Sequence, residues 1–226
     1  MLVARNMHPD WLSNAYVVAD SEGGTAVFVD AGADPEPLAL AVAGWGAKPA
    51  AVLRTHGHHD HVEWEDELRK RYGVPVVAEP GEWDLGGIRV RGTATPGHSD
   101  DMVAFVVADE VVFTGDTLFR DAVGGGDPGQ VRSSVMDVFM ALPDAMRVLP
   151  GHTDETTIGR ERAENPFVRV WSGAAPEGTE RVRAGGRDAT LLVWSPDYDG
   201  KGKAWVRFDG GRDAIIGGSR VERMEG

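Results

Sequence analysis

The chain of 226 residues contains no cysteine. No disulfide bond can form, and any bound metal must be held by nitrogen and oxygen ligands instead of thiolates. The absence of cysteine fits a cytoplasmic protein, and we expect that location. Long apolar runs are also missing, because glycine, lysine and proline interrupt the best candidate, residues 39–53. We therefore expect no segment that spans a bilayer, and the first ten residues lack the pattern of a secretory signal.

Positive charge is scarce. The sequence has 23 lysine and arginine residues against 36 aspartate and glutamate residues, which gives a formal net charge of −13. Such a surface repels phosphate backbones and anionic membranes. We therefore expect neither nucleic acid nor a membrane as a partner. We expect a small-molecule substrate, and a homodimer stays open as an alternative to a monomer. The apolar content of 42% suits a folded domain with a sizeable core.

Periodic apolar patterns predict alternating strands and helices over the first part of the chain. Trp64, Leu68 and Tyr72 recur four residues apart, which indicates an amphipathic helix that ends at Gly73. In all, strands are predicted at residues 14–19, 25–30, 50–54, 74–77, 88–90, 102–107, 111–113 and 147–149, and helices at residues 35–44, 64–72, 135–142 and 158–164. This order implies mixed sheets with helices packed outside them.

The amino-acid composition changes near residue 172. Residues 173–178 are typical of a linker, and apolar runs at 190–194 and 204–208 then flank a turn, as in a β-hairpin. We therefore predict a catalytic domain over residues 1–171 and a small all-β extension over residues 172–226. The extension could line the substrate entrance or mediate dimerisation. Its tryptophans, Trp194 and Trp205, are expected to pack in the core, since aromatic residues favour strands.

Four of the seven histidines lie between residues 56 and 61, in the run Thr-His-Gly-His-His-Asp-His. Alternate side chains of an extended loop share a face, so His56 and His58 can reach one cation together. Asp60 and His61 follow where the chain turns into a helix and can reach a second cation. His59 is expected to point away from that face. The ordinary role of a single core or surface histidine does not explain four in six positions beside an aspartate, and a surface patch rich in histidine stays open as the alternative.

Three later residues complete a candidate metal site. His98, Asp116 and His152 each follow a glycine directly after a strand or turn. Neutral imidazole and carboxylate suit zinc, iron or manganese, and the two oxygens of Asp116 could serve one cation each. Two other interpretations are weaker. Ser99, beside His98, has no evident oriented base for a serine triad, and the glycines at 124–126 lack the lysine of a phosphate loop, so a flexible loop is expected there.

The motif His56-x-His58-x-Asp60-His61, followed by His98, Asp116 and His152, resembles the metallo-β-lactamase superfamily, and most closely its glyoxalase II-like hydrolases. The resemblance covers residues 12–168. It implies an α/β (α+β) fold, the αββα sandwich, with metals at one edge of two sheets and a small all-β appendage added here. It also implies a division of ligands: His56, His58 and His98 at one metal, Asp60, His61 and His152 at a second, Asp116 between them, and Asp30 supporting the ligand loop.

The resemblance further implies a hydrolase of thioesters or related small esters. Two divalent cations, zinc first and iron or manganese as alternatives, would activate a water that Asp60 orients or deprotonates. Two departures argue against glutathione as part of the substrate. Residues 117–126 lack the usual glutathione-site sequence, and the C-terminal part is expected to be β structure instead of the helical substrate-binding domain of glyoxalase II. Alternatives are a persulfide dioxygenase with one iron held by His56, His98 and Asp116, or a lactonase or phosphodiesterase.

Overall fold

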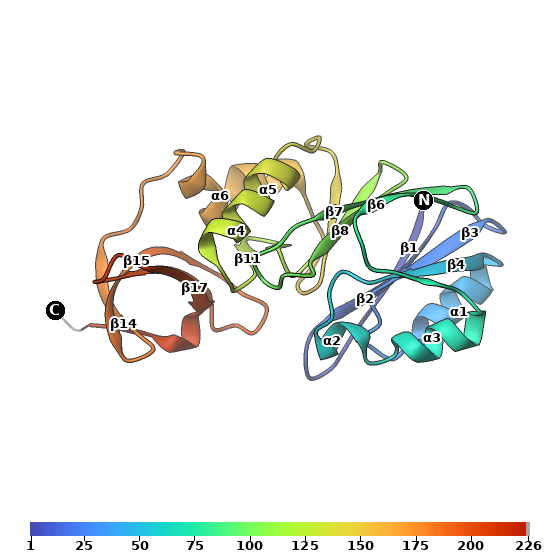
Figure 1. The fold of residues 1–226 in the computed structure, drawn as a ribbon, viewed down its shortest axis with the longest axis horizontal. Helices are drawn as coiled ribbons and strands as arrows, with labels where there is room; N and C mark the ends of the chain where they lie inside the picture. The colour runs from blue at the N-terminus through green and yellow to red at the C-terminus, as the bar shows by residue number, and fades with distance from the viewer. Residues whose placement is uncertain (225–226) are drawn as a thin grey trace.

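Strict alternation of buried side chains along the strands divides the core into layers. In β8 (Val103–Val107), Val103, Phe105 and Val107 face one apolar cluster, and Ala104 and Val106 face another. Successive side chains of a strand point to opposite sides, so such a strand must be covered on both sides. The computed structural model, which describes residues 1–224, shows that cover as two facing sheets between two layers of helices (Figure 1).

The first sheet is mixed: its first three strands are antiparallel and its last two run parallel to the third. In spatial order the strands are β1 (Leu2–Met7), β2 (Asn14–Ala19), β3 (Thr25–Val29), β4 (Lys48–Leu53) and β5 (Val76–Val77). Its outer side packs against Leu38 and Val42 of one helix and Leu68 of another. These helices are α1 (Glu36–Trp45) and α3 (Glu65–Tyr72).

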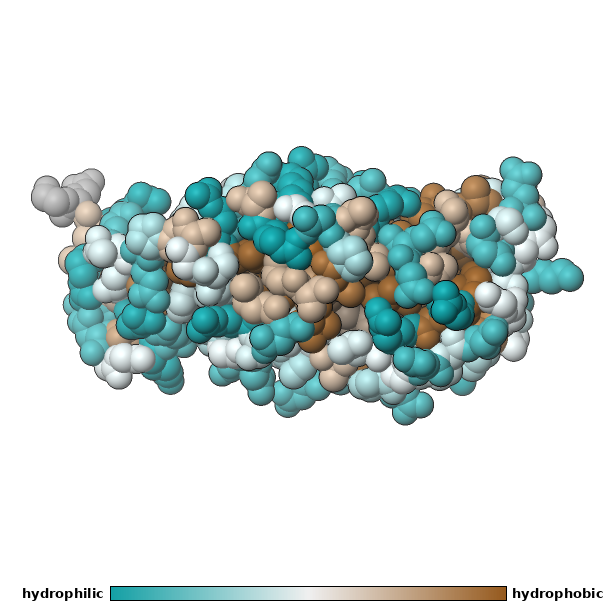
Figure 2. All heavy atoms as spheres, turned by 90° about the horizontal axis from the view of Figure 1, so that it is seen from above, coloured by the Kyte–Doolittle hydropathy of each residue, from teal (hydrophilic) through white to brown (hydrophobic). Residues whose placement is uncertain are grey.

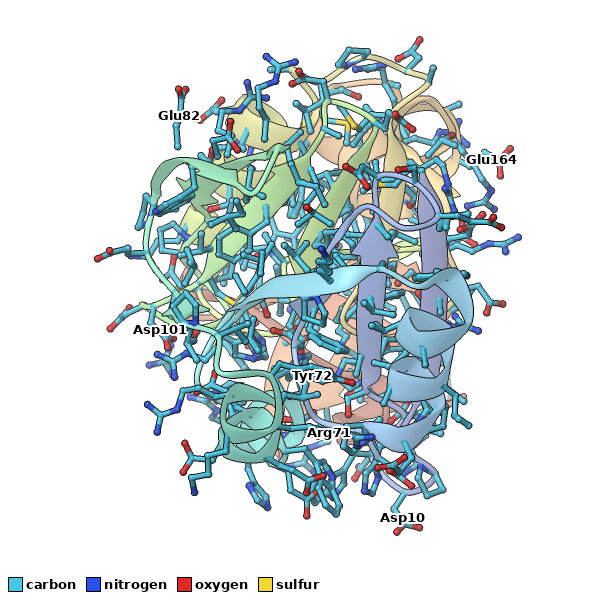
Figure 3. All side chains as sticks on the ribbon, turned by 90° about the vertical axis from the view of Figure 1, so that its right-hand side faces the viewer. Asp10, Arg71, Tyr72, Glu82, Asp101 and Glu164 are labelled. Atoms are coloured by element: carbon cyan, nitrogen blue, oxygen red, sulfur yellow. The ribbon has the colours of Figure 1, made fainter. Side chains whose placement is uncertain are left out.

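An ion pair joins these two helices. Arg71, near the end of α3, pairs with Glu36 at the start of α1. Figure 3 shows Arg71 and Tyr72 near the lower end of the helical layer. Tyr72 packs against Phe28 on the outer side of the first sheet, with ring centroids 5.3 Å apart. The side chains at the end of α3 thus fix both its neighbour helix and the sheet beneath.

The second sheet has six strands, all antiparallel except the parallel pair β9 and β12. In spatial order they are β13 (Thr156–Thr157), β12 (Arg147–Pro150), β9 (Val111–Gly115), β8, β7 (Ile88–Ala94) and β6 (Gly81–Leu85). A short hairpin follows β9, formed by β10 (Leu118–Phe119) and β11 (Ala122–Val123). The outer side is covered by α4 (Pro128–Ser133), the π-helical segment η1 (Ser134–Phe139), α5 (Ile158–Glu164) and α6 (Pro166–Trp171).

The C-terminal part forms a third, wholly antiparallel sheet beside these helices (Figure 1). Its strands in spatial order are β17 (Asp213–Gly217), β16 (Lys203–Phe208), β15 (Arg187–Ser195), β14 (Glu180–Ala184) and β18 (Val221–Arg223), with the 3-10 turn η2 (Gly218–Arg220) before β18. Trp205 of β16 packs against Trp171 of α6, with ring centroids 6.1 Å apart. Because the third sheet shares a cluster with the helices, a domain boundary at residue 172 stays a prediction.

The predicted sandwich with a small all-β appendage is confirmed, and most predicted elements are present. Several strands escaped prediction, among them β1, β6 and β14. Each of these three carries charged residues and has few fully buried side chains, so its apolar alternation is weak. Where a helix was predicted at 135–142, the chain is π-helical over residues 134–139. The prediction that both C-terminal tryptophans pack in the core holds for Trp205 and is wrong for Trp194, which is 39% exposed.

The helices of this fold are short, and the longest, α1, has 10 residues. Within residues 1–224 no helix has the length and apolar character needed to cross a membrane. Figure 2 shows one face of the molecule, on which hydrophilic residues occupy much of the periphery and apolar residues gather toward the middle.

Candidate metal centre

The seven predicted ligands come together at one edge of the two facing sheets. His56 and His58 lie in the loop after β4, and the next two ligands lie on the short helix α2 (His59–Val62). His98 lies in the loop between β7 and β8. Asp116 follows β9 and His152 follows β12. Because β9 and β12 are parallel, both side chains emerge at the same edge.

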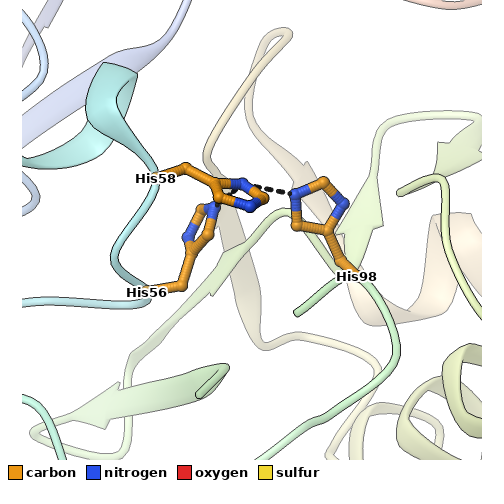
Figure 4. Close-up of side chains that lie close together, drawn as sticks. All are labelled: His56, His58 and His98. Carbon is orange, nitrogen blue, oxygen red and sulfur yellow. Dashed lines mark hydrogen bonds between the residues drawn. The ribbon is translucent and has the colours of Figure 1, made fainter. Parts of the chain in front are cut away.

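Three imidazoles form the first group, shown in Figure 4. Nε2 of His56 lies 3.0 Å from Nδ1 of His58, and Nε2 of His98 lies 3.0 Å from the same atom. His56 is buried, His98 is half-buried and His58 is exposed. Three ring nitrogens therefore converge on one point that is reached from solvent on the His58 side.

The second group contains Asp60, His61 and His152, whose candidate ligand atoms lie within 4.8 Å of one another. Oδ2 of Asp60 is 3.7 Å from Nε2 of His61 and 3.5 Å from Nε2 of His152. Asp116 lies between the two groups. Its Oδ1 is 3.4 Å from Nε2 of His61, and its Oδ2 is 3.3 Å from Nε2 of His152 and 3.6 Å from Nε2 of His98. Asp116 thus contacts both groups through its two oxygens.

The outer nitrogens of the histidines determine which inner nitrogens carry a lone pair. Nδ1 of His98 contacts the carbonyl oxygen of Gly125 at 2.9 Å, and Nδ1 of His152 contacts the carbonyl oxygen of Leu12 at 3.0 Å. A carbonyl oxygen only accepts, so both Nδ1 atoms must carry the proton. In the neutral ring, Nε2 is then unprotonated and points its lone pair into the site.

Asp30 fixes two further imidazoles through its carboxylate. Its Oδ2 lies 2.8 Å from Nδ1 of His61, and it also accepts the hydroxyl of Thr55 at 2.8 Å. Since the Thr55 hydroxyl donates to Asp30, its oxygen accepts from Nδ1 of His56, 3.1 Å away. In their neutral forms, both His56 and His61 therefore present Nε2 lone pairs inward. The predicted supporting position of Asp30 thus has a geometric basis, and its left-handed backbone, with φ 53°, turns the carboxylate under the ligand loop.

The donor set fits bound cations. Among residues 1–224, Nε2 of His61 and Oδ1 of Asp116 are buried polar atoms with no hydrogen-bond partner. Buried polar atoms without a partner are rare, and an ion is one explanation for them. Zinc–nitrogen bonds of about 2.1 Å in tetrahedral geometry place neighbouring ligand atoms about 3.4 Å apart, close to the distances found here. Gly151 keeps this space open, because a Cβ there would lie 2.3 Å from Oδ1 of Asp116.

The pKa shifts of the histidines show where protons are held when no ion is bound. Burial lowers the pKa of His56 to about 4, with a further lowering by His61. Burial also disfavours the charged form of His152, but the carboxylate of Asp116 prevails and raises its pKa to about 9. The pKa of His61 is raised well above its usual value by Asp116 and Asp30, against the effect of burial. Without an ion, protons on these two rings neutralise the buried carboxylates.

Other sequence expectations have mixed outcomes. His59 is exposed, contacts Trp11 and belongs to none of the ligand groups, in line with its exclusion. Ser99 donates to Asp101 at 2.6 Å, which offers no histidine base for a serine nucleophile. The glycine run 124–126, expected as a flexible loop, has a structural use: Gly125 accepts from His98, and a Cβ at Gly124 would lie 1.7 Å from the carbonyl oxygen of Asp116.

One residue beside the centre escaped prediction altogether. The ring of Tyr198, from the loop between β15 and β16, stacks on the imidazole of His152, with centroids 4.0 Å apart and planes at 11°. Phe119 lies edge-on to both rings. A tyrosine in a predicted turn carries no local signal of such a contact, because the contact depends on how the third sheet packs on α6.

The fold and this ring of side chains define a metal-binding protein of the αββα sandwich class. A family model for the metallo-beta-lactamase superfamily matches residues 8–87. The uncharacterized protein Rv2581c of Mycobacterium tuberculosis is 32% identical over 206 residues, 69% of this chain and 92% of the relative. The chain belongs to the metallo-β-lactamase superfamily, and its histidines and aspartates form groups that could hold metal ions, as expected for a hydrolase of that superfamily.

Further relatives carry functional descriptions. YqgX of Bacillus subtilis, described as a probable metallo-hydrolase, is 27% identical over 71% of this chain and 94% of its own. BaeB of Bacillus velezensis, described as a probable polyketide biosynthesis zinc-dependent hydrolase, is 25% identical over 66% of this chain and 76% of its own.

Solved structures share the fold. The BLEG-1 B3 metallo-β-lactamase has a TM-score of 0.68 and 26% identity, covering 74% of this chain and 99% of its own. ETHE1 from Myxococcus xanthus has a TM-score of 0.66 and 26% identity over 77% and 91%. TTHA1623 in a di-iron-bound form has a TM-score of 0.61 and 31% identity over 73% and 99%.

Proposed function

We propose that the protein is a glyoxalase II-like hydrolase of thioesters or related small esters. The seven predicted side chains would hold two divalent cations, zinc in first place. The observation that supports this most directly is the set of inward lone pairs on His56, His61, His98 and His152, each fixed by an acceptor behind the ring. The description of BaeB as a probable zinc-dependent hydrolase supports a metal at this site, and the di-iron-bound form of TTHA1623 supports a pair of cations.

Hydrolysis of a thioester adds water to the carbonyl carbon and releases a carboxylic acid and a thiol. Bound cations would supply Lewis acidity and lower the pKa of water toward about 7. Asp60 is the group placed to take the proton of that water. Its Oδ2 contacts His61 and His152, while its Oδ1 makes no hydrogen bond within residues 1–224. Burial opposes ionisation, but His152 lowers the pKa of Asp60, so the carboxylate stays ionised at neutral pH.

Metal content and turnover, measured on the same preparation, test this proposal. We expect two zinc ions for each chain by elemental analysis and hydrolysis of members of a panel of thioesters, lactones and phosphodiesters, with thioesters preferred. Asp116→Ala should abolish turnover and lower the metal content, because it removes the carboxylate between the two groups. His59→Ala is the matched control and should keep both, because His59 is exposed and outside the ligand groups. Full activity of Asp116→Ala would refute the proposal.

The same measurement separates the alternative chemistry. A persulfide dioxygenase with a single iron would contain one iron for each chain and consume oxygen only when a thiol persulfide is supplied. The iron in TTHA1623 shows that a related centre accepts this metal. One iron together with persulfide-dependent oxygen uptake would replace the hydrolase proposal.

A further inference from the structure

Charge is unevenly distributed along the chain. Residues 172–226 contain nine basic and nine acidic residues, so the net charge of −13 comes entirely from residues 1–171. All nine of these basic residues lie between Arg181 and Arg223, in the third sheet and its turns. Because like charges repel, the third sheet is the part of the molecule on which an anion is repelled least.

The seven arginines of the third sheet fall into two groups. Four of them pair with a carboxylate of the same sheet or its turns: Arg181 with Asp209, Arg183 with Asp188, Arg207 with Asp213, and Arg223 with Glu180. Within residues 1–224 the other three, Arg187, Arg212 and Arg220, form no ion pair, and their guanidinium groups make no hydrogen bond. All three line one cavity of about 340 Å³ between the third sheet and the start of α4. The arginines without a partner are therefore gathered at one place.

The two carboxylates in the lining of this cavity have other partners. Asp127 accepts the backbone N–H of Gln130 at 2.8 Å, as the cap at the start of α4. Asp213 binds Arg207 through two hydrogen bonds, of 2.8 and 2.9 Å, and accepts the indole N–H of Trp205 at 3.0 Å. The positive charge of the three arginines is thus left unmatched by ion pairs within the described chain.

The surrounding residues hold these guanidinium groups without using their donors. Cζ of Arg187 lies 4.0 Å from the centroid of the Phe208 ring, and Cζ of Arg212 lies 5.8 Å from it. Stacking occupies the face of a guanidinium, whereas its N–H donors lie at the edge, in the plane of the group. Arg220 lies beside Gly185, whose N–H donates to the Arg220 carbonyl oxygen at 2.8 Å, and a Cβ on Gly185 would lie 3.3 Å from Nη2 of Arg220. The three side chains are therefore placed by their neighbours and keep their donors free.

A second cavity adjoins the first. It has a volume of about 440 Å³, and it shares Arg212 and three further lining residues with the first cavity. Its lining adds Arg132, which also forms no ion pair within residues 1–224, and the side chains of Trp171 and Trp205. A molecule held by the three arginines therefore has space to extend along α4.

We propose that the first cavity, the arginine pocket, binds a small molecule that carries two or more phosphate groups. A guanidinium matches a phosphate through two parallel N–H···O bonds, and three guanidinium groups suit more than one phosphate. The volume of the pocket falls in the range of small-molecule sites, about 300–1,000 Å³. None of the seven candidate metal ligands lines the pocket. The site is therefore separate from the metal centre and does not depend on the proposed hydrolase function.

Titration calorimetry on the purified protein tests this inference. Pyrophosphate and tripolyphosphate are the probes, and both should bind more tightly than inorganic phosphate. Arg187→Gln and Arg220→Gln should each weaken the affinity for tripolyphosphate roughly 10- to 100-fold, which corresponds to losing a hydrogen bond to a charged group. Arg220→Lys should retain part of the affinity, because it keeps the charge and loses the paired donors. The double variant Arg91→Gln/Arg169→Gln is the matched control and should bind as the wild type does, because both arginines are exposed and lie outside the pocket.

Two checks keep this test specific. Polyphosphates also bind divalent cations, so elemental analysis before and after titration verifies that each variant has the metal content of the wild type. Any binding at the metal centre would persist in Arg187→Gln and Arg220→Gln, and only the loss that these variants cause is assigned to the pocket. Circular dichroism verifies that the variants are folded. If loss of the stacking on Phe208 unfolds Arg187→Gln, Arg220→Gln still tests the pocket, because Arg220 does not stack on that ring.

The inference is overturned if tripolyphosphate at millimolar concentration does not bind, or if the wild type and both arginine variants bind it equally well. Citrate and a short single-stranded oligonucleotide test the class of ligand. If either binds more tightly than tripolyphosphate, with the same dependence on Arg187 and Arg220, the pocket takes a carboxylate or a nucleic acid and the phosphate proposal is wrong. Thioester turnover enters none of these measurements, so its absence in the wild type would count against the proposed function alone.

Discussion

The substitution Asp30→Asn isolates the effect of proton placement on metal binding. Asp30 is 3% exposed and accepts from Nδ1 of His61, from the Thr55 hydroxyl and from the Thr55 backbone N–H. Asparagine has nearly the same shape and tolerates positive φ, so the backbone at φ 53° gains no strain. Its amide, however, replaces one accepting oxygen with a donating NH2 group. Since the Thr55 N–H still needs an acceptor, the NH2 group faces His61 and the Thr55 hydroxyl.

A donor facing Nδ1 forces His61 to carry its proton on Nε2, the atom that points at Asp116. That ring can then no longer offer a lone pair to the site. Loss of a partner behind a metal ligand typically lowers metal affinity about 10- to 100-fold, or about 1.4 to 2.8 kcal/mol. Thr55→Val should have a smaller effect, because it removes the acceptor of His56 Nδ1 and one donor to Asp30 but leaves the Asp30 carboxylate facing His61. We expect the order wild type, Thr55→Val, Asp30→Asn in decreasing affinity.

Competition with a chromophoric zinc chelator measures these affinities directly. Circular dichroism checks that each variant is folded, and Asp34→Asn serves as a control, because within residues 1–224 the side chain of Asp34 accepts only the exposed N–H of Glu36. A folded Asp30→Asn protein with wild-type zinc affinity would show that the tautomer of His61 does not depend on Asp30.

Two further predictions concern stability. In chelator-treated protein, His152 has a pKa of about 9 when folded against about 6.5 when unfolded. The stabilisation from its bound proton is complete below pH 6.5 and is lost as pH rises through 9. The free energy of unfolding, measured in urea, should therefore fall by up to about 1.4 kcal/mol per pH unit between pH 7 and 9 for each extra proton that the folded state holds. Zinc-loaded protein should lack this decline, and a flat profile without zinc would contradict the assignment. Phe113→Ala, at a 1% exposed position between the facing sheets, should lower the unfolding free energy by about 3–5 kcal/mol, whereas Leu40→Ala, 70% exposed, should change it by less than about 0.5 kcal/mol; similar losses for both would contradict the core described here.

The sequence predicted the parts of this molecule that depend on local chemistry. Apolar runs such as residues 102–107 predicted strands, and the structure has β8 there, with both of its faces buried. The candidate ligands were recognisable because each follows a strand or turn and has a side chain suited to a cation. The structure brings all seven together, and their binding of metal stays a prediction.

The remaining features depend on contacts between distant segments. β1 has Arg5 and Asn6 in its C-terminal half, which weakens its apolar pattern. Its strand conformation depends on pairing with β2. The hydrogen bond from the Thr55 hydroxyl to Asp30 joins residues 25 positions apart, and no rule of sequence spacing predicts it. Tyr198 stood in a predicted turn and reaches His152 only because Trp205 and its sheet pack on α6.

The predicted ligands and the tyrosine that stacks on His152 come from different parts of the chain. Every predicted ligand is encoded before β14, whereas the aromatic cover is encoded in the hairpin tip after β15. A shortened chain that stops before β14 would keep the whole ligand set and lose the ring that stacks on His152. Mutation or exchange of that hairpin can therefore remove the aromatic contact to His152 while all seven predicted ligands stay in place.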